Sequence, residues 1–241
     1  KAMNDALAAA RRDMADYREY IETWVHEVKT PIASARLTLE NLPGPPLQGL
    51  EEALFQIEGY VEQALFYARS GAVERDYVVR PMALRQAASD AVKKYARPLI
   101  AAGFSVELEG LDAVAYADGK WVEFILGQLI SNAIKYRGEH PRLVFTQSRA
   151  EQSVALNVAD NGVGIPQADL PRVCEKGFTG ENGRKLSKRS TGLGLYLCRT
   201  LCGRLGLGFS IASQAGEGTR VSIIFPKGRF YLLGEREELK Q

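Results

Sequence analysis

The sequence has little that would indicate a disulfide-stabilised, membrane-spanning or nucleic-acid-binding protein. Its 241 residues include only three cysteines, an odd number without metal-type spacing, so we expect reduced, packed thiols. No apolar run reaches the roughly 18 residues that span a bilayer, and no signal peptide is visible. A formal net charge of +2 is far from the strong basic excess of a dedicated nucleic-acid binder. The length and composition instead suit a globular protein of one or two domains.

Heptad spacing near the start of the chain predicts two helices. Apolar residues recur alternately four and three positions apart in two series: Ile21, Val25, Val28, Ile32, Ala35, Leu39 and Leu42, then Leu47, Leu50, Leu54, Ile57, Val61, Ala64 and Ala68. The stretch "PGPP" at 43–46 separates them, because no helix crosses it. Such a hairpin buries little by itself. Two hairpins packed as a four-helix bundle would bury both seams, so we expect a homodimer.

Beyond the hairpin the pattern becomes mixed, and four segments are predicted: a hairpin at 1–70, a linker at 71–80, a second domain at 81–226 and a charged tail at 227–241. Strands are expected at 76–80 and in "FSVELE", "AVAYA", "RLVFTQS", "VALNVAD", "LGFSIASQ" and "TRVSIIFP"; helices are expected at 82–101, 118–136 and about 191–206. Because strands and helices interleave without regular βαβ alternation, we expect an α+β layer sandwich.

Three glycine-bearing turns are candidate ligand loops. "DNGVGI" at 160–165 follows a strand, and its aspartate could accept a hydrogen bond from an exocyclic amine. "STGLGLYL" at 190–197 opens a helix, whose N-terminus suits phosphate. "GEGTRVSIIF" at 216–225 precedes a strand. Each alone is more often an ordinary turn than a ligand loop, and none is a Walker loop or a dinucleotide fingerprint.

The helix expected at 118–136 carries polar residues on one face. Gln128, Asn132, Lys135 and Tyr136 follow helical spacing. They could be a solvated surface, or they could supply a magnesium ligand and a phosphate contact, since Mg²⁺ takes oxygen donors and substrate phosphates. The residues alone leave both alternatives open.

The stretch "WVHEVKTPI" at 24–32 contains His26, one of two histidines in the chain. A histidine here could be packed, bound to a metal or a nucleophile. His26 lies one position beyond the seam residue Val25, so another domain could reach it. The other histidine, His140, lies in a turn-like stretch and receives no role.

Taken in order, these motifs resemble the ATP-binding domain of sensor histidine kinases, within the wider family of histidine kinases, gyrases, Hsp90 and MutL. With the "HEVKTP" box, the resemblance spans about residues 15–226. It implies a bacterial two-component sensor histidine kinase: a helical hairpin that dimerises into a four-helix bundle, followed by an α/β-sandwich domain that binds ATP and Mg²⁺.

The resemblance also implies roles for residues of the second domain. Asn132 would hold Mg²⁺, Lys135 would contact phosphate and Tyr136 would border the nucleotide. The family usually has a second asparagine where this chain has Gln128, so no metal role is carried onto that residue. Asp160 would accept from the adenine amine. The rest of the pocket would be formed by Gly162, Gly164, Gly192, Gly194, Leu195, Gly216, Gly218 and Thr219.

The loop "EKGFTGENGRKLSKRS" at 175–190 would form a mobile lid. Phe178 resembles the phenylalanine of the family's lid region. Lys185, Lys188 and Arg189 could reach the phosphates, and the sequence does not choose among them. A solvated loop is the equal alternative for these cations.

In the family the box histidine accepts the γ-phosphoryl group, which here implies His26 as the phosphoacceptor. Imidazole is partly neutral near pH 7, and a carboxylate on Nδ1–H would leave Nε2 to attack. Glu27 is the candidate orienter and general base. Thr30 would help to place a water that dephosphorylates a partner response regulator. Pro31 would let the helix bend after Glu27, because it removes a helical hydrogen bond.

The box also looks like that of the intramembrane-sensing kinases that pair with antibiotic-export transporters. This implies a cytoplasmic portion of a membrane-anchored protein, with membrane helices ahead of Lys1 and a transporter partner, but no nucleic acid. Two rivals stay open. One is another ATPase of the superfamily, which would lack the box on a heptad hairpin. The other is a dimeric scaffold that binds ATP without kinase activity.

Overall fold

The computed structural model describes residues 27–35, 37, 47–70, 77–180 and 192–227. The chain divides into two compact units, Lys1–Ala72 and Val73–Gln241. None of the described helices is both long enough and apolar enough to cross a bilayer.

The first unit is helical wherever it is described. Residues 27–35 are helical, and the helix continues through Pro31. Helix α2 (Leu47–Ser70) begins at the residue where the second heptad series begins. The proline-rich stretch at 43–46 lies outside the described residues. On α2, Leu54 is 49%, Val61 39% and Leu65 52% exposed, so this helix leaves an apolar face uncovered in the single chain.

The second unit is built on a five-stranded sheet. The strands lie in the order β2 (Ser105–Leu108), β4 (Arg142–Ala150), β5 (Ser153–Asp160), β7 (Gly218–Pro226) and β6 (Gly208–Gln214). β2 pairs parallel with β4, and the other neighbours are antiparallel. The predicted pairing of "RLVFTQS" with "VALNVAD" is therefore confirmed as β4 with β5. The α/β-sandwich part of the predicted fold class is confirmed as well, whereas the dimeric hairpin stays a prediction.

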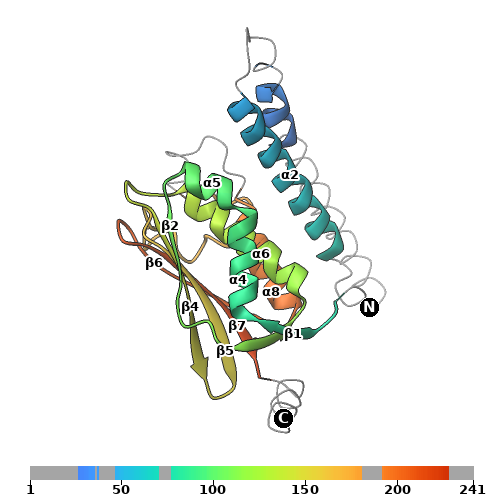
Figure 1. The fold of residues 1–241 in the computed structure, drawn as a ribbon, viewed down its shortest axis with the longest axis vertical. Helices are drawn as coiled ribbons and strands as arrows, with labels where there is room; N and C mark the ends of the chain where they lie inside the picture. Colours follow the sequence, from blue (N-terminus) through green and yellow to red (C-terminus); the bar gives the residue numbers. More distant parts are fainter. Residues whose placement is uncertain (1–26, 36, 38–46, 71–76, 181–191, 228–241) are drawn as a thin grey trace, which may run out of the picture. The chain divides into compact units, whose positions relative to one another are not determined.

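Helices α4 (Leu84–Lys94), α5 (Ala96–Ala101), α6 (Gly119–Lys135) and α8 (Gly194–Arg204) lie on one face of this sheet (Figure 1). The strands alternate, because successive side chains point to opposite faces. The inward residues of the central strands are buried: Leu143, Phe145, Val154, Leu156, Val158, Val221, Ile223 and Phe225. α6 lies deepest among the helices, with Val122, Ile125, Leu126 and Ile130 fully buried. Because this core is buried, it fixes the positions of the ends of α6 and of the strands, where the polar residues lie.

Three predicted element boundaries are wrong. The strand expected at 76–80 is β1 at Arg80–Ala83, which pairs antiparallel with β3 (Val114–Ala117). The helix expected at 82–101 is two helices, because Pro98 has no N–H for the carbonyl four residues earlier. The helix expected at about 191–206 begins at Gly194, because Gly192 has a φ of +66° that a right-handed helix cannot include.

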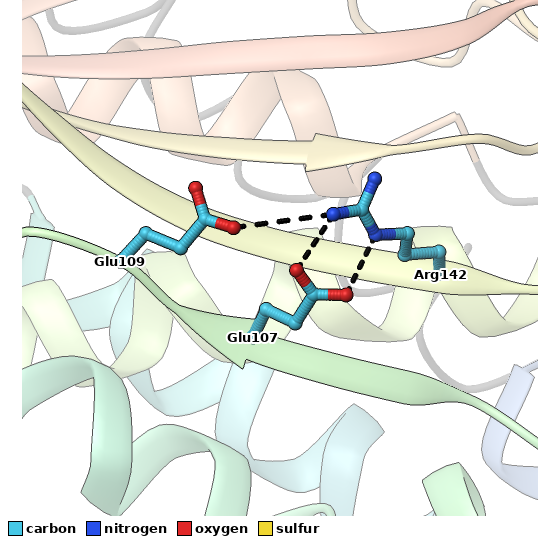
Figure 2. A network of polar contacts seen from close by, with 3 residues as sticks. All are labelled: Glu107, Glu109 and Arg142. Atoms are coloured by element: carbon cyan, nitrogen blue, oxygen red, sulfur yellow. Dashed lines mark hydrogen bonds and ion pairs between the residues drawn. The ribbon is translucent and has the colours of Figure 1, made fainter.

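An ion cluster joins β2 to β4 at one edge of the sheet (Figure 2). The guanidinium of Arg142 donates to both carboxylate oxygens of Glu107, at 2.8 and 2.6 Å, and lies 3.9 Å from a Glu109 oxygen. The hydrogen bonds from Arg142 lower the pKa of Glu107. Because these side chains are exposed, solvent screens the cluster and its contribution to stability is small.

Cys174, Cys198 and Cys202 are free and buried, as predicted. Burial raises the pKa of the Cys202 thiol to about 12. Because the thiolate is the reactive form, these groups act as small packed side chains at neutral pH.

Candidate functional site

Asp160 is the last residue of β5 and the centre of the candidate site. The backbone N–H of Gly162 donates to its Oδ1 at 2.9 Å, and Thr219 lies opposite it on β7. Burial raises the pKa of the Asp160 carboxyl, while backbone hydrogen bonds from Gly162 and Thr219 oppose that rise. The result is a half-buried carboxyl that the backbone holds in one orientation.

The loop after Asp160 is pressed against the end of α6. A Cβ on Gly162 would lie 2.3 Å from the carbonyl oxygen of Tyr136, so only glycine fits there. The N–H of Val163 donates to the same oxygen at 2.9 Å. Gly164 has a φ of +66°, and a Cβ on it would lie 2.0 Å from the carbonyl oxygen of Gln214. The two glycines predicted to border the base therefore bring three chain segments into contact.

The start of β7 closes the other side of Asp160. Gly218 has a φ of +114°, and a Cβ there would lie 2.0 Å from the carbonyl oxygen of Asp160. Gly216, on the preceding turn, has a φ of +84° and open space around it. The "GEG" motif thus combines a turn glycine with a close-approach glycine.

Ser213 fastens this corner, and the sequence analysis missed it. Its Oγ accepts the N–H of Ile165 at 2.8 Å, donates to the carbonyl of Gly218 at 2.7 Å and lies 2.9 Å from Oγ1 of Thr219. The feature that could have identified Ser213 is its place in the β6–β7 hairpin, where it lies directly opposite Thr219.

Asn161 was also missed as a fastening residue. Its side-chain oxygen accepts the N–H of Arg142 at 2.7 Å, and its amide donates to the carbonyl of His140 at 2.8 Å. These bonds attach the loop that contains Gly162 to the start of β4. The "DN" pair therefore has one residue that faces the site and one that anchors the loop.

A second part of the site lies where α8 begins. A Cβ on Gly194 would lie 3.4 Å from Oε1 of Gln128 and 3.9 Å from Oδ1 of Asn132. The first turn of α8 therefore faces the polar side of α6. Gln128 is only 6% exposed and contacts this turn. Leu195, in the same turn, is half-buried. Unpaired N–H groups at a helix start favour phosphate, and an amide oxygen suits a hard cation.

The donor set fits magnesium held jointly with a nucleotide. Among the described residues, no three His, Cys, Asp or Glu side chains lie together as a metal cluster. Asn132 is half-buried, and its side-chain oxygen lies next to the N-terminus of α8, the kind of helix end that binds phosphate. Mg²⁺ commonly takes one or two protein oxygens and completes its shell with phosphates and water.

α6 connects the two parts of the site. Asn132 lies on its last turn, and its carbonyl accepts the N–H of Tyr136 at 2.9 Å. Tyr136 then holds the loop after Asp160 through its own carbonyl. Nζ of Lys135 lies 5.6 Å from the centroid of the Tyr136 ring. All three residues predicted on this helix end are thus near the site.

Phe178 lies near the N-terminal end of the predicted lid, in the part that the structure describes. The guanidinium of Arg172 stacks 4.4 Å from its ring centroid. Gly192 packs on its backbone, since a Cβ there would lie 2.6 Å from the Phe178 carbonyl oxygen. The two ends of the loop therefore meet. Lys185, Lys188 and Arg189 lie outside the described residues.

In the first unit, Glu27 is half-buried and Thr30 is exposed on the helical stretch 27–35. His26 lies outside the described residues. The predicted phosphoacceptor box and the Asp160 site belong to different units of the chain.

The comparisons with known proteins agree with this geometry. Residues 117–229 match the family described as histidine kinase-, DNA gyrase B-, and HSP90-like ATPase. The chain is 34% identical over 208 residues to the sensor histidine kinase YxdK of Bacillus subtilis, covering 86% of this chain and 64% of that protein. It is 33% identical over 207 residues to the sensor protein BceS of Halalkalibacterium halodurans, covering 85% and 61%.

Two solved structures share the fold. The histidine kinase AdeS of Acinetobacter baumannii aligns with a TM-score of 0.60 at 22% identity, over 83% of this chain and 97% of that one. Histidine kinase ThkA, solved in complex with the response regulator TrrA, aligns with a TM-score of 0.65 at 19% identity, over 90% and 64%.

The fold of the second unit and the family match together indicate an ATPase domain of the histidine kinase, gyrase and HSP90 type at residues 117–229. Over most of its length the chain is similar to bacterial proteins that are named sensor histidine kinases. It spans slightly less than two thirds of the length of the two curated relatives, at 64% and 61%.

Proposed function

We propose that this chain transfers the γ-phosphoryl group of ATP to His26 and then to an aspartate of a partner response regulator. The observation that carries the proposal is the end of α6. There the Tyr136 carbonyl holds the Asp160 loop, and the Asn132 side chain faces the start of α8. One helix end thereby fixes the distance between a carboxyl suited to an adenine amine and a helix start suited to phosphates.

Nucleotide recognition follows from these two parts. Asp160 accepts the exocyclic amine of adenine, and the glycines beside it let the base approach the backbone. The phosphates lie over the first turn of α8 near Gly194, and Lys135 and a lid cation contact them. Asn132 would help to hold a magnesium ion together with the phosphates, and the ion would neutralise charge on the phosphoryl group that is transferred.

The transfer itself takes place on the first unit. Nε2 of neutral His26 attacks the γ-phosphorus, the bond to the β,γ-bridging oxygen breaks, and ADP leaves with that electron pair. Glu27 accepts a hydrogen bond from Nδ1–H and stabilises the charge that develops on the ring. The protein therefore contributes mainly positioning and charge neutralisation.

Thr30 supports removal of the phosphoryl group from the response regulator. It lies four residues after His26 in the sequence and is exposed on the helical stretch 27–35. Its hydroxyl positions a water that attacks the aspartyl phosphate of the response regulator. One surface then both adds and removes the phosphoryl group.

We also propose that two copies of the chain pair through their hairpins. The exposed apolar face of α2, which contains Leu54, Val61 and Leu65, supports this assembly, because a second hairpin would cover it. The resemblance of the "HEVKTP" box further suggests membrane anchoring and a transporter partner for the whole protein.

The test of the kinase compares wild type, Asn132→Ala and Ser131→Ala with labelled ATP and Mg²⁺. Ser131 is exposed beside Asn132 and serves as the matched control. We expect Asn132→Ala to abolish labelling while leaving the dimer intact, and Ser131→Ala to label normally. Equal labelling in all three would remove Asn132 from the metal role. Nucleotide binding without any label in the wild type would favour the silent scaffold.

The phosphatase proposal has its own test. Thr30→Ala should autophosphorylate normally but dephosphorylate the response regulator more slowly. An unchanged dephosphorylation rate would return Thr30 to the ordinary surface.

A further inference from the structure

We infer that Asp118 is a positioning residue that fastens the segment joining the two units to the helix that carries Asn132. This inference rests on the proposed kinase function, because its consequence is control over how the ATP-binding unit is presented to His26. Asp118 is one of two buried polar residues among those described, at 8% exposed.

The carboxylate of Asp118 divides its two oxygens between two chain segments. Oδ1 accepts the N–H of Lys120 at 3.0 Å and caps the start of α6. Oδ2 accepts the N–H of Val78 at 3.1 Å. A single side chain thus satisfies a helix-start amide and an amide of the segment that enters the second unit.

The surroundings of this contact make it specific. β1 pairs with β3, and Arg80 lies opposite Ala117, so Val78 runs alongside the residue that begins α6. The Tyr77 side chain is half-buried next to Asp118. Burial raises the pKa of the Tyr77 phenol, a hydrogen bond with the Asp118 backbone lowers it, and the Asp118 charge raises it further. Tyr77 and Val78 are therefore bound to Asp118 through two separate groups.

The position of Asp118 links this contact to the nucleotide site. It caps the first turn of α6, whose last turn carries Asn132. The side-chain bond fastens the chain at Val78, two residues before β1 begins at Arg80. Without this bond, the residues directly before β1 would no longer be fastened to the start of α6. The nucleotide site would keep its own contacts but would be presented less precisely to His26, so positioning would be lost rather than binding.

Two substitutions act on this bond from opposite sides, one by weakening its acceptor and the other by removing its donor. Asp118→Asn has one acceptor oxygen, so it can serve Lys120 or Val78 but not both, and asparagine remains a good helix cap. Val78→Pro removes the donor and leaves α6 unchanged. Val78→Ala keeps the backbone N–H and is the matched control, since the Val78 side chain is itself exposed.

The experiment measures autophosphorylation at saturating ATP and nucleotide affinity for wild type, the three single variants and the Asp118→Asn/Val78→Pro double variant of the full chain. We expect Asp118→Asn and Val78→Pro each to lower the rate by about tenfold, with nucleotide affinity within about twofold of wild type. The double variant should be no slower than either single variant, because both remove the same bond. Hydrogen exchange of the Val78 amide should accelerate in Asp118→Asn and stay slow in wild type.

Three results would overturn this inference. The first is a wild-type rate of autophosphorylation in Asp118→Asn. The second is a double variant whose loss of rate is the product of the two single losses. The third is a fall in nucleotide affinity as large as the fall in rate, which would mark Asp118 as merely structural. An unlabelled wild type would instead overturn the proposed kinase function, and the inferred role of Asp118 with it.

Discussion

The two units of the chain differ in how they deal with their apolar residues. In the second unit the largest core side chains, such as Phe145, Ile125 and Leu126, are fully buried within the unit itself. In the first unit, Leu54 and Leu65 remain about half exposed, at 49% and 52%. A unit with a closed core is stable by itself, whereas a helix with an uncovered apolar face requires another surface. The difference supports the proposal that the first unit pairs with a second copy, since the second unit needs no further surface to cover its core.

The closed unit should be broken most severely at Gly218. In Gly218→Ala the added Cβ would lie 2.0 Å from the Asp160 carbonyl oxygen, at a φ of +114°. Because the neighbour is backbone, it cannot move aside without separating β5 from β7. We expect a loss of at least about 3 kcal/mol in the free energy of unfolding, and loss of nucleotide binding.

The matched control is Gly216→Ala, which has a φ of +84° but open space around it. It should cost only the conformational term, about 1–2 kcal/mol. Chemical denaturation of both variants measures the difference, and equal losses would show that the close approach at Gly218 is unimportant.

The open unit should be broken by a charge on its apolar face. Leu54→Glu would place a carboxylate in the proposed helix–helix seam, where it would have to be desolvated without a partner. We expect the dimer to dissociate at micromolar concentration in sedimentation or light scattering, while nucleotide binding by the second unit is retained. Gln56→Glu adds the same charge at an exposed position off the seam and should leave the dimer intact. A dimeric Leu54→Glu would contradict the assembly proposed for the hairpin.

A pH titration tests how the protonation of Asp160 affects the stability and the nucleotide affinity of the second unit. Burial raises the pKa of its carboxyl, so the folded state binds this proton more tightly than the unfolded state does. The stability from this term is fully present below the ordinary pKa of about 3.9 and is lost as pH rises through the raised pKa. Nucleotide affinity should change in the opposite sense, because the ionised carboxylate is the better acceptor for the adenine amine.

We therefore expect affinity for ATP to fall as pH is lowered through a pKa above about 3.9, as measured by calorimetry. Asp160→Asn should bind about tenfold more weakly and lose this pH dependence. Asp90→Asn, on the exposed face of α4, should keep the wild-type profile. A wild-type profile in Asp160→Asn would exclude Asp160 as the titrating acceptor.

The smallest effect is expected at the sheet edge drawn in Figure 2. Arg142→Ala removes the ion pairs with Glu107 and Glu109, which are exposed and screened. The backbone N–H of Arg142, which donates to Asn161, remains. We expect the melting temperature to change by less than about 2 °C, and less still at high salt. A large change at every salt concentration would show that this edge supports the site.

Regular spacing and glycine motifs were the most informative features of the sequence. The second heptad series predicted the start of α2, and alternation predicted that β4 pairs with β5. The motif "DNGVGI" predicted a close approach of the backbone, and a side chain at Gly162 would indeed collide, whereas "GEG" predicted only a turn before a strand. These features depend on neighbours in the sequence or on the size of one residue.

What could not be predicted depends on partners far apart in the chain. Ser213 and Asn161 look like ordinary polar residues until β6 and β4 are placed beside the Asp160 loop. Residues 77–79 are apolar enough for a strand, yet the N–H of Val78 is taken by the Asp118 side chain instead of by a neighbouring strand. Tertiary contacts of this kind have no periodic signal.

The most direct test of the central claim uses labelled ATP and Mg²⁺ with wild type and His26→Gln, followed by acid and base treatment. We expect a label that is labile in acid, stable in base and present only in the wild type, as a phosphohistidine at His26 requires. A label of equal strength in His26→Gln, or one that survives acid, would contradict it.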